Sequence, residues 1–119
     1  ELAALTARIL KPGGGFSFVL VDGQGTGRGA KTLSNLLATR AISLLKDGAR
    51  DGAAARAVHD YLYTYRNGQV SATLNILSVD FQSGKILMSR NNPAPFYVLD
   101  RRGLHSFAEP STPIGLLPM

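Results

Sequence analysis

An apolar run that ends in a carboxylate and is followed by closely spaced glycines constrains this chain more than any other feature. Residues 16–22 read Phe-Ser-Phe-Val-Leu-Val-Asp, which is typical of a mostly buried β-strand. The glycines that follow are Gly23, Gly25, Gly27 and Gly29. Because glycine has no Cβ, this turn can take positive φ values and let a ligand approach the main chain beside Asp22. The pattern predicts a metal or phosphate site, and the alternative is a plain glycine-rich connector.

Composition limits the classes that need to be considered. The chain has 119 residues, 45% of them apolar, which predicts a single domain over 1–119 with a real core. It contains no cysteine, so disulfides, zinc–thiolate sites and thiol nucleophiles are excluded. No apolar run is long enough to predict a membrane segment, and residues 1–10 do not resemble a signal peptide, so we expect a cytoplasmic protein. The net charge of +5 is scattered along the chain, which argues against nucleic-acid binding.

The first half of the chain predicts two strands and then two helices. A weak strand over 4–10 should form a hairpin with the strand over 16–22, across a Lys-Pro-Gly-Gly-Gly turn. The apolar period predicts a helix from about residue 28 to 47, with its inward face made by Leu33, Leu37, Ala41, Leu44 and Leu45. A second helix, capped by Asp51 and ending near residue 66, should bury Ala54, Val58, Tyr61, Leu62 and Tyr65. The short connection makes the two helices antiparallel neighbours.

The second half follows the period of β-strands. Alternating residues over 70–76 predict a strand, 85–90 predict its return strand, and 96–99 should pair with 104–107 across a turn. We therefore predict an α+β fold, in which the helix pair covers one face of an antiparallel sheet. The other face then needs a further layer or a partner, and self-association is one way to cover it.

Two nucleotide-binding motifs compete for the glycine-rich segment. Residues 25–32 differ by one position from a P-loop, because Ala30 replaces the glycine before the lysine. The same glycines also match a short dinucleotide-binding pattern. Both require a parallel sheet, whereas the alternation over 71–75 favours an antiparallel strand, and a second helix follows where a strand is needed.

The third possibility is a site for a hard cation, in which the carboxylate of Asp22 and the carbonyl of Gly23 supply the oxygen ligands that Mg²⁺ or Mn²⁺ prefers. Here the residues resemble a family. Residues 21–27 with Ala30 look like the D-G-x-G-x-G-x-x-A motif of PPM-type (protein phosphatase type 2C-like) serine/threonine phosphatases, in the bacterial SpoIIE-like and RsbX-like branch. Residues 71–76, 89–95 and 112–116 are similar to three later stretches of the same family, in the same order.

The resemblance implies an α-β-β-α sandwich and hydrolysis of a phosphoserine or phosphothreonine protein with two Mn²⁺ or Mg²⁺ ions. Asp22 would bridge the two ions and Gly23 would be a further ligand. The substrate would be a regulatory protein, such as an anti-anti-sigma (STAS) type protein in partner-switching signalling. The family's upstream and downstream acidic motifs are not found, so we expect the chain to be the central part of a phosphatase domain, with weak metal binding and little turnover alone. The alternative is a metal-free regulatory or scaffolding domain with a phosphatase fold.

The remaining titratable residues are interpreted as structural. Asp80 and Asp100 lie in predicted hairpin turns, where aspartate commonly accepts backbone hydrogen bonds. His59 and His105 are interpreted as surface or boundary residues rather than ligands or bases.

Overall fold

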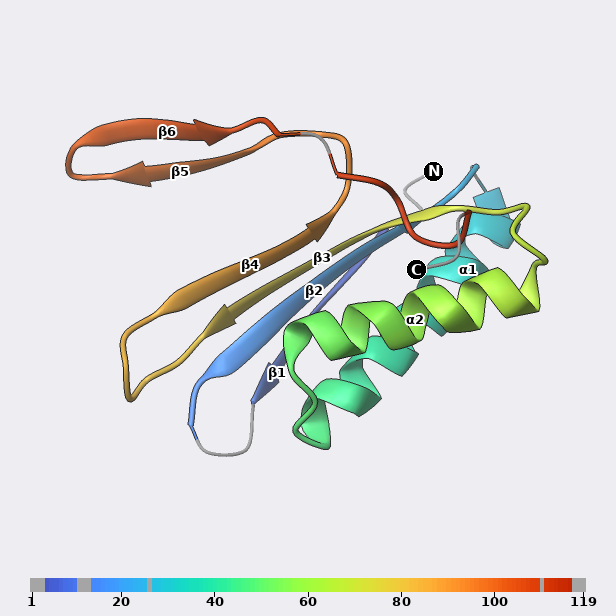
Figure 1. Cartoon of the computed structure of the whole chain (residues 1–119), viewed down its shortest axis with the longest axis horizontal. Helices are drawn as coiled ribbons and strands as arrows, with labels where there is room; N and C mark the ends of the chain where they lie inside the picture. The colour runs from blue at the N-terminus through green and yellow to red at the C-terminus, as the bar shows by residue number, and fades with distance from the viewer. Residues whose placement is uncertain (1–3, 11–13, 26, 110, 117–119) are drawn as a thin grey trace.

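The fold is built around a four-stranded antiparallel sheet with two helices on one face. The computed structural model describes residues 4–10, 14–25, 27–109 and 111–116, and of residues 4–9 it describes only the backbone. The sheet has the order β1-β2-β3-β4, and its strands are β1 (Ala4–Leu10), β2 (Phe16–Gly23), β3 (Ala72–Val79) and β4 (Ile86–Asn91). Figure 1 shows these strands side by side. The predicted α+β fold class is confirmed.

Two antiparallel helices cover the sheet on a single face (Figure 1). The first, α1 (Gly27–Lys46), packs on β1 and β2, and the second, α2 (Asp51–Tyr65), packs on α1 and β3. Val19 and Val21 of β2 and Leu74 and Ile76 of β3 are fully buried beneath them, because alternate side chains of a strand point to the same face. Burial of these side chains against the helices supplies the hydrophobic core.

The inward face of α1 agrees with the predicted period, but that of α2 is rotated. Leu33, Leu37, Ala41 and Leu45 are buried as expected, and Leu44 is half-buried. On α2, Ala54, Val58 and Leu62 are buried, whereas Tyr65 is 52% exposed and stacks on the half-buried Tyr61. The His59 side chain is instead part of the inward face of α2. It is only 3% exposed, so its interpretation as a surface or boundary residue is wrong.

Residue Asp51 also differs from its predicted role. It is the first residue of α2 rather than its cap, since Arg50 precedes the helix with an extended backbone and makes no side-chain cap. The Asp51 side chain is buried at 2% exposure, which places a carboxylate at the positive end of the helix dipole.

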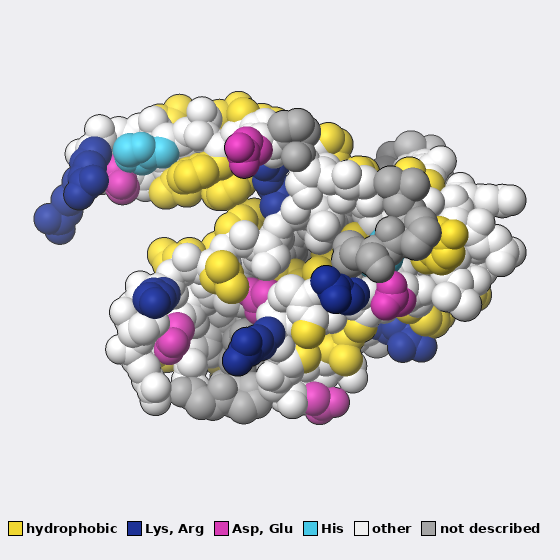
Figure 2. Space-filling model, in the orientation of Figure 1, with side chains coloured by type: hydrophobic (Ala, Val, Ile, Leu, Met, Phe, Trp, Pro, Cys, Tyr) yellow, Lys and Arg dark blue, Asp and Glu magenta, His cyan; other side chains and the backbone are white. Residues whose placement is uncertain are grey.

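A separate hairpin completes the described chain. It consists of β5 (Phe96–Asp100) and β6 (Gly103–Phe107), which pair only with each other, and it projects beyond β4 (Figure 1). The sheet face opposite the helices is covered less completely than the helix face, because Phe18 and Leu20 remain 36% and 40% exposed. Figure 2 shows a hollow between the hairpin and the body of the molecule, with hydrophobic side chains along it.

The stretch after the hairpin returns to the sheet. Ile114 forms a two-way backbone bridge with Ala72 at the start of β3 and is fully buried. Ile114, which lies in the 112–116 stretch that resembles the family, therefore contributes to the core next to the end of β2, since Ala72 is the register partner of Gly23.

Candidate metal centre

The carboxylate of Asp22 lies at the end of β2, on the face of the sheet that the helices leave open. It is exposed, and its strand neighbours alternate between the two faces, so Asp22 continues the row of Phe18 and Leu20. Its register partner on β3 is Thr73. The alternation of buried and exposed positions along β2 therefore presents the charge to solvent at a fixed place on the sheet.

The next residue, Gly23, is buried between β3 and the first turns of α1. Its N–H donates a hydrogen bond to Ser34 Oγ at 2.8 Å, and the same hydroxyl donates to the carbonyl of Ala30 at 2.9 Å. A Cβ at position 23 would lie only 3.0 Å from that Ala30 carbonyl oxygen. Glycine at this position thus allows the strand end and the helix to approach each other closely.

The loop after Gly23 is also tied to β3. The backbone N–H of Gln24 donates to the carbonyl of Ser71 at 3.0 Å, and its side-chain Oε1 accepts from the Ser71 N–H at 2.9 Å. Ser71 Oγ lies 3.3 Å from the same oxygen. The Asp22–Gln24 segment is therefore held from two sides, by α1 and by the start of β3.

Two of the closely spaced glycines have the positive φ values that the sequence predicts for this turn. Gly25 and Gly27 have φ values of +94° and +79°, which other residues rarely adopt. They turn the chain from the strand end into α1 within a few residues. Gly29 has no positive φ and lies inside the helix.

The other carboxylates of the described residues do not gather near Asp22. Asp80 follows the opposite end of β3 and accepts hydrogen bonds from the Gln82 N–H and Ser83 Oγ, and Asp100 accepts from the Arg102 N–H, so both turn assignments are confirmed. Six residues of strand separate the two ends of the β2–β3 pair, which is about 20 Å. No group of three or more histidine, aspartate or glutamate side chains is arranged for a metal within the described part of the chain.

The two histidines have structural contacts. His59 Nδ1 accepts a hydrogen bond from the Gly115 N–H at 2.9 Å, and its ring stacks on Tyr63. Because Nδ1 accepts this bond, the neutral ring carries its proton on Nε2, and the lone pair that a base or ligand would use is occupied. His105 is exposed and lies 3.0 Å from Asp100 in the hairpin. Neither histidine is placed to act on a ligand at Asp22.

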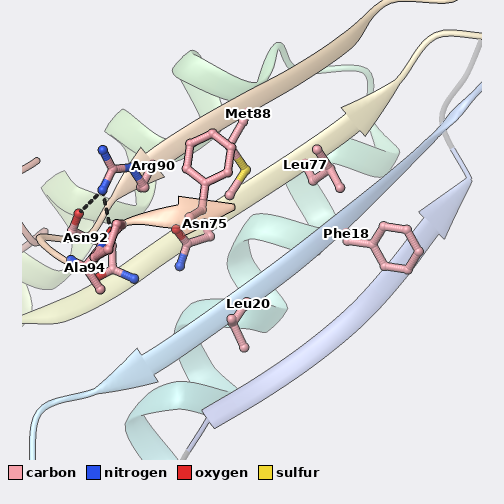
Figure 3. Close-up of a pocket in the computed structure, with 10 residues that line it drawn as sticks. Phe18, Leu20, Asn75, Leu77, Met88, Arg90, Asn92 and Ala94 are labelled. Atoms are coloured by element: carbon pink, nitrogen blue, oxygen red, sulfur yellow. Dashed lines mark hydrogen bonds between the residues drawn. The ribbon is translucent and has the colours of Figure 1, made fainter. Parts of the chain in front are cut away.

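A pocket of about 360 Å³ lies on the open face, farther along the sheet from Asp22. Figure 3 shows Phe18, Leu20, Leu77 and Met88 around it, together with Arg90 at its edge. The Arg90 guanidinium donates to the carbonyls of Asn92, Ala94 and Glu109, so it holds the loops at the base of the hairpin. The pocket is mainly apolar, and the positive charge at its edge is already engaged by main-chain oxygens.

The donor atoms at the end of β2 fit a hard divalent cation in their chemistry but not in their number. An exposed carboxylate beside a main chain held by Ser34 and Gln24 offers oxygen ligands, which Mg²⁺ and Mn²⁺ prefer. Within the described residues, no two further acidic or histidine side chains join Asp22 in a group that could hold a metal. The site can therefore contribute to the coordination of a cation, with the remaining ligands supplied by water or by other groups.

The arrangement of a D-G turn between β2 and α1, with a helix pair on one face of an antiparallel sheet, agrees with the comparison to known proteins. The family model of stage II sporulation protein E (SpoIIE) matches residues 12–119. The chain belongs to the SpoIIE family. No curated protein sequence matches this SpoIIE-family chain.

Solved structures give the same fold for this SpoIIE-family chain. It is similar to the PP2C phosphatase domain with a regulatory fragment of SpoIIE from Bacillus subtilis, at 18% identity and a TM-score of 0.75, covering 98% of this chain and 39% of that one. It is also similar to the RsbU and RsbW domains of a Mycobacterium tuberculosis protein, at 22% identity and a TM-score of 0.79, covering 97% and 33%.

A SpoIIE family protein from Thermanaerovibrio acidaminovorans has 16% identity and a TM-score of 0.71, covering 86% of this chain and 52% of that one. The chain thus spans between a third and about half of the length of these three solved chains. At these identities the likeness establishes the fold. That fold is antiparallel, since β2 pairs antiparallel with both β1 and β3, so the P-loop and dinucleotide-binding alternatives are wrong.

The sequence alone indicates Asp22 and Gly23 but does not indicate the residues that hold them in place. Ser34 lies in the apolar stripe of α1, between Leu33 and Leu37, and is 1% exposed. A hydroxyl on an inward helix face is the signal that could have identified it, because a buried hydroxyl needs hydrogen-bond partners. The pairing of Gln24 with Ser71 joins residues 47 positions apart and has no signal in a single sequence.

Proposed function

We propose that this chain is part of a metal-dependent serine/threonine protein phosphatase, in which Asp22 and Gly23 form part of the binding site for Mn²⁺ or Mg²⁺. The observation that carries the proposal is the exposed carboxylate of Asp22 at the end of β2, followed by a main chain held in place by α1 and β3. Membership of the SpoIIE family and the PP2C fold of the solved relatives support the same reaction class.

The chemistry divides between the cations and the chain. Bound Mg²⁺ or Mn²⁺ lowers the pKa of water and stabilises charge on a phosphoryl group. The Asp22 carboxylate contributes negative charge and an oxygen ligand, and the hydrogen bonds of Gly23 and Gln24 keep the strand end from moving away from it. No covalent phosphoenzyme is required, which is compatible with a chain that has no cysteine.

The substrate that we propose is a phosphorylated regulatory protein of the anti-anti-sigma (STAS) type, as in partner-switching signalling in the cytoplasm. One of the similar structures joins an RsbU domain to an RsbW domain, which supports a role in that kind of regulation. No described helix of this chain is long and apolar enough to cross a membrane.

A second candidate is a regulatory domain that has the phosphatase fold but does not catalyse hydrolysis. The observation that favours it is that no group of three or more acidic or histidine side chains among the described residues could hold a metal, since a pair of divalent cations needs several carboxylates to offset their charge. We therefore expect the chain alone to bind Mn²⁺ weakly, and the decisive assay needs a protein that contains the whole phosphatase domain.

The first prediction separates the two candidates. In a protein with the whole domain, Asp22→Asn should lower Mn²⁺-dependent hydrolysis of a phosphoserine protein more than about 100-fold, because the substitution removes charge from the cation site. The free energy of unfolding should change by less than about 0.5 kcal/mol, since Asp22 is exposed. The measurements are steady-state turnover with added Mn²⁺ and urea unfolding.

The matched control is Asp60→Asn, which removes the same charge from the exposed face of α2 and should leave turnover unchanged. Equal turnover in wild type and Asp22→Asn would contradict the assignment of Asp22. Absence of turnover in the wild-type domain at saturating Mn²⁺ would favour the regulatory candidate.

A further inference from the structure

We propose that Ser34 is a positioning residue for the cation-binding end of β2. This inference rests on the proposed function, because it gives α1 the task of holding the Asp22–Gly23 peptide in the orientation that the site uses. Ser34 is separated from the site by eleven positions in the sequence and touches it through one hydroxyl.

The hydrogen bonds of Ser34 fix a specific peptide group. The N–H of Gly23 belongs to the peptide plane that also contains the carbonyl of Asp22. When Ser34 Oγ accepts from that N–H at 2.8 Å, it sets the rotation of the plane and hence the direction in which the chain leaves the Asp22 Cα. The hydroxyl proton goes to the Ala30 carbonyl at 2.9 Å, so the acceptor lone pair stays turned toward Gly23.

The space around Gly23 points independently to the same contact. A Cβ at position 23 would lie 3.1 Å from Ser34 Oγ and 3.2 Å from Leu33 Cδ2, closer than side chains normally approach. Glycine at position 23 and serine at position 34 therefore form a matched pair. The glycine lets the helix approach, and the serine uses the short distance to hold the strand end.

Helix packing alone does not explain a serine at this position. Ser34 is 1% exposed on an apolar stripe, where alanine would fill the same space with a better helix propensity. Thr39 shows what such a hydroxyl does without a partner on the sheet, since it donates to the Asn35 carbonyl at 2.7 Å from an exposed position of the same helix. The additional feature of Ser34 is the bond from Gly23.

The test uses a ¹⁵N-labelled protein that contains the whole phosphatase domain, and it consists of two NMR measurements. Hydrogen exchange of the Gly23 amide reports the bond without any metal, and broadening of the signals around Asp22 by added Mn²⁺ reports affinity even when binding is weak. For Ser34→Ala we expect at least about tenfold faster exchange at Gly23 and about tenfold weaker Mn²⁺ binding, the size that loss of a partner behind a metal ligand usually causes.

Two controls separate positioning from general stability. Thr39→Ala removes a hydroxyl from the same helix and should leave both measurements as in wild type. Ala41→Gly loosens α1 at a buried position that is remote from Gly23, and it should lower the unfolding midpoint without a change in Mn²⁺ affinity.

Other results would contradict the positioning role of Ser34. Unchanged Mn²⁺ affinity in Ser34→Ala beside normal binding in wild type would overturn it and leave the proposed function standing. Equal weakening in Ala41→Gly, or collapse of the dispersed spectrum in Ser34→Ala, would assign the hydroxyl to stability only. No Mn²⁺ broadening near Asp22 in wild type would overturn the cation site and this inference together.

Discussion

The backbone conformation of Gly115 lets residues 111–116 pack closely against the core. Gly115 has a φ of +99°, and a Cβ there would lie 2.5 Å from both Leu62 Cδ2 and the Val70 carbonyl oxygen. Gly115→Ala should therefore lower the free energy of unfolding by about 2–4 kcal/mol, combining backbone strain with overpacking. Urea unfolding followed by circular dichroism measures it.

Gly48 provides the matched control for this substitution. Its φ of +93° is nearly the same, but a Cβ there would meet nothing within 4 Å. Gly48→Ala should cost only the strain, about 1 kcal/mol. Equal losses for the two variants would show that Leu62 and Val70 yield to the added methyl group.

Some features of single residues are predictable because the residue's own chemistry determines them. The positive φ of Gly25 and Gly27 follows from their spacing after Asp22, because glycine is the residue that adopts it without cost. The inward position of His59 could not be predicted in the same way. Its burial depends on a hydrogen bond from Gly115, which is 56 positions away in the sequence.

At the scale of the elements, the turn between β3 and β4 makes the stability of the fold depend on pH. Hydrogen bonds to the Asp80 carboxylate, first from the Gln82 N–H and then from Ser83 Oγ, lower its pKa below the ordinary value of 3.8. A carboxylate whose folded pKa is lowered stabilises the fold above the unfolded pKa, and this contribution is lost as the pH falls through the folded pKa. Wild type should thus lose part of its stability below pH 3.8 through this turn.

Asp80→Asn tests this dependence. The variant cannot ionise, so the difference in melting temperature between it and wild type should be largest at neutral pH and shrink below pH 3.8. Asp47→Asn, an exposed residue after α1, is the control for general charge effects. A constant difference down to about pH 2 would contradict the role of the Asp80 carboxylate.

The elements themselves were largely predictable, and the errors have a common cause. The sequence predicts all six strands and both helices of the described residues, because each has an apolar period or a turn at its end. The apolar period does not predict the rotation of α2, because it treats Tyr65 as an apolar residue. In the structure the Tyr65 ring stacks on Tyr61, and the Arg40 guanidinium lies over the Tyr61 ring.

For the whole molecule, the two faces of the sheet should respond differently to polar substitution. Phe18→Ser and Leu20→Ser, on the open face, should each lower the free energy of unfolding by about 1 kcal/mol, because each side chain already leaves more than a third of its surface exposed. Val19→Ser, between them on the helix face, should cost about 3 kcal/mol, because it leaves a cavity and buries a hydroxyl.

Sedimentation of the same variants tests self-association. If the apolar open face draws two copies together, the Phe18→Ser and Leu20→Ser double variant should stay monomeric at concentrations at which wild type associates. Association that is equal in both proteins would place the contact elsewhere. The open face was predictable from the alternation along β2, whereas the projecting hairpin depends on Arg90 and three carbonyl groups that no local pattern connects.

The central pairing of the sheet has a consequence for the order of folding. β1 joins β2, and β3 joins β4, across short turns, but β2 and β3 are separated in sequence by both helices, a loop of about 50 residues. Closing that loop costs conformational entropy, which is offset only when β2 and β3 pair and the helices pack on them. The two outer hairpins can therefore form early, whereas the pairing of β2 with β3 requires the helix pair to pack on the sheet. We therefore expect the end of β2 that carries Asp22 to be completed at the slow step of folding.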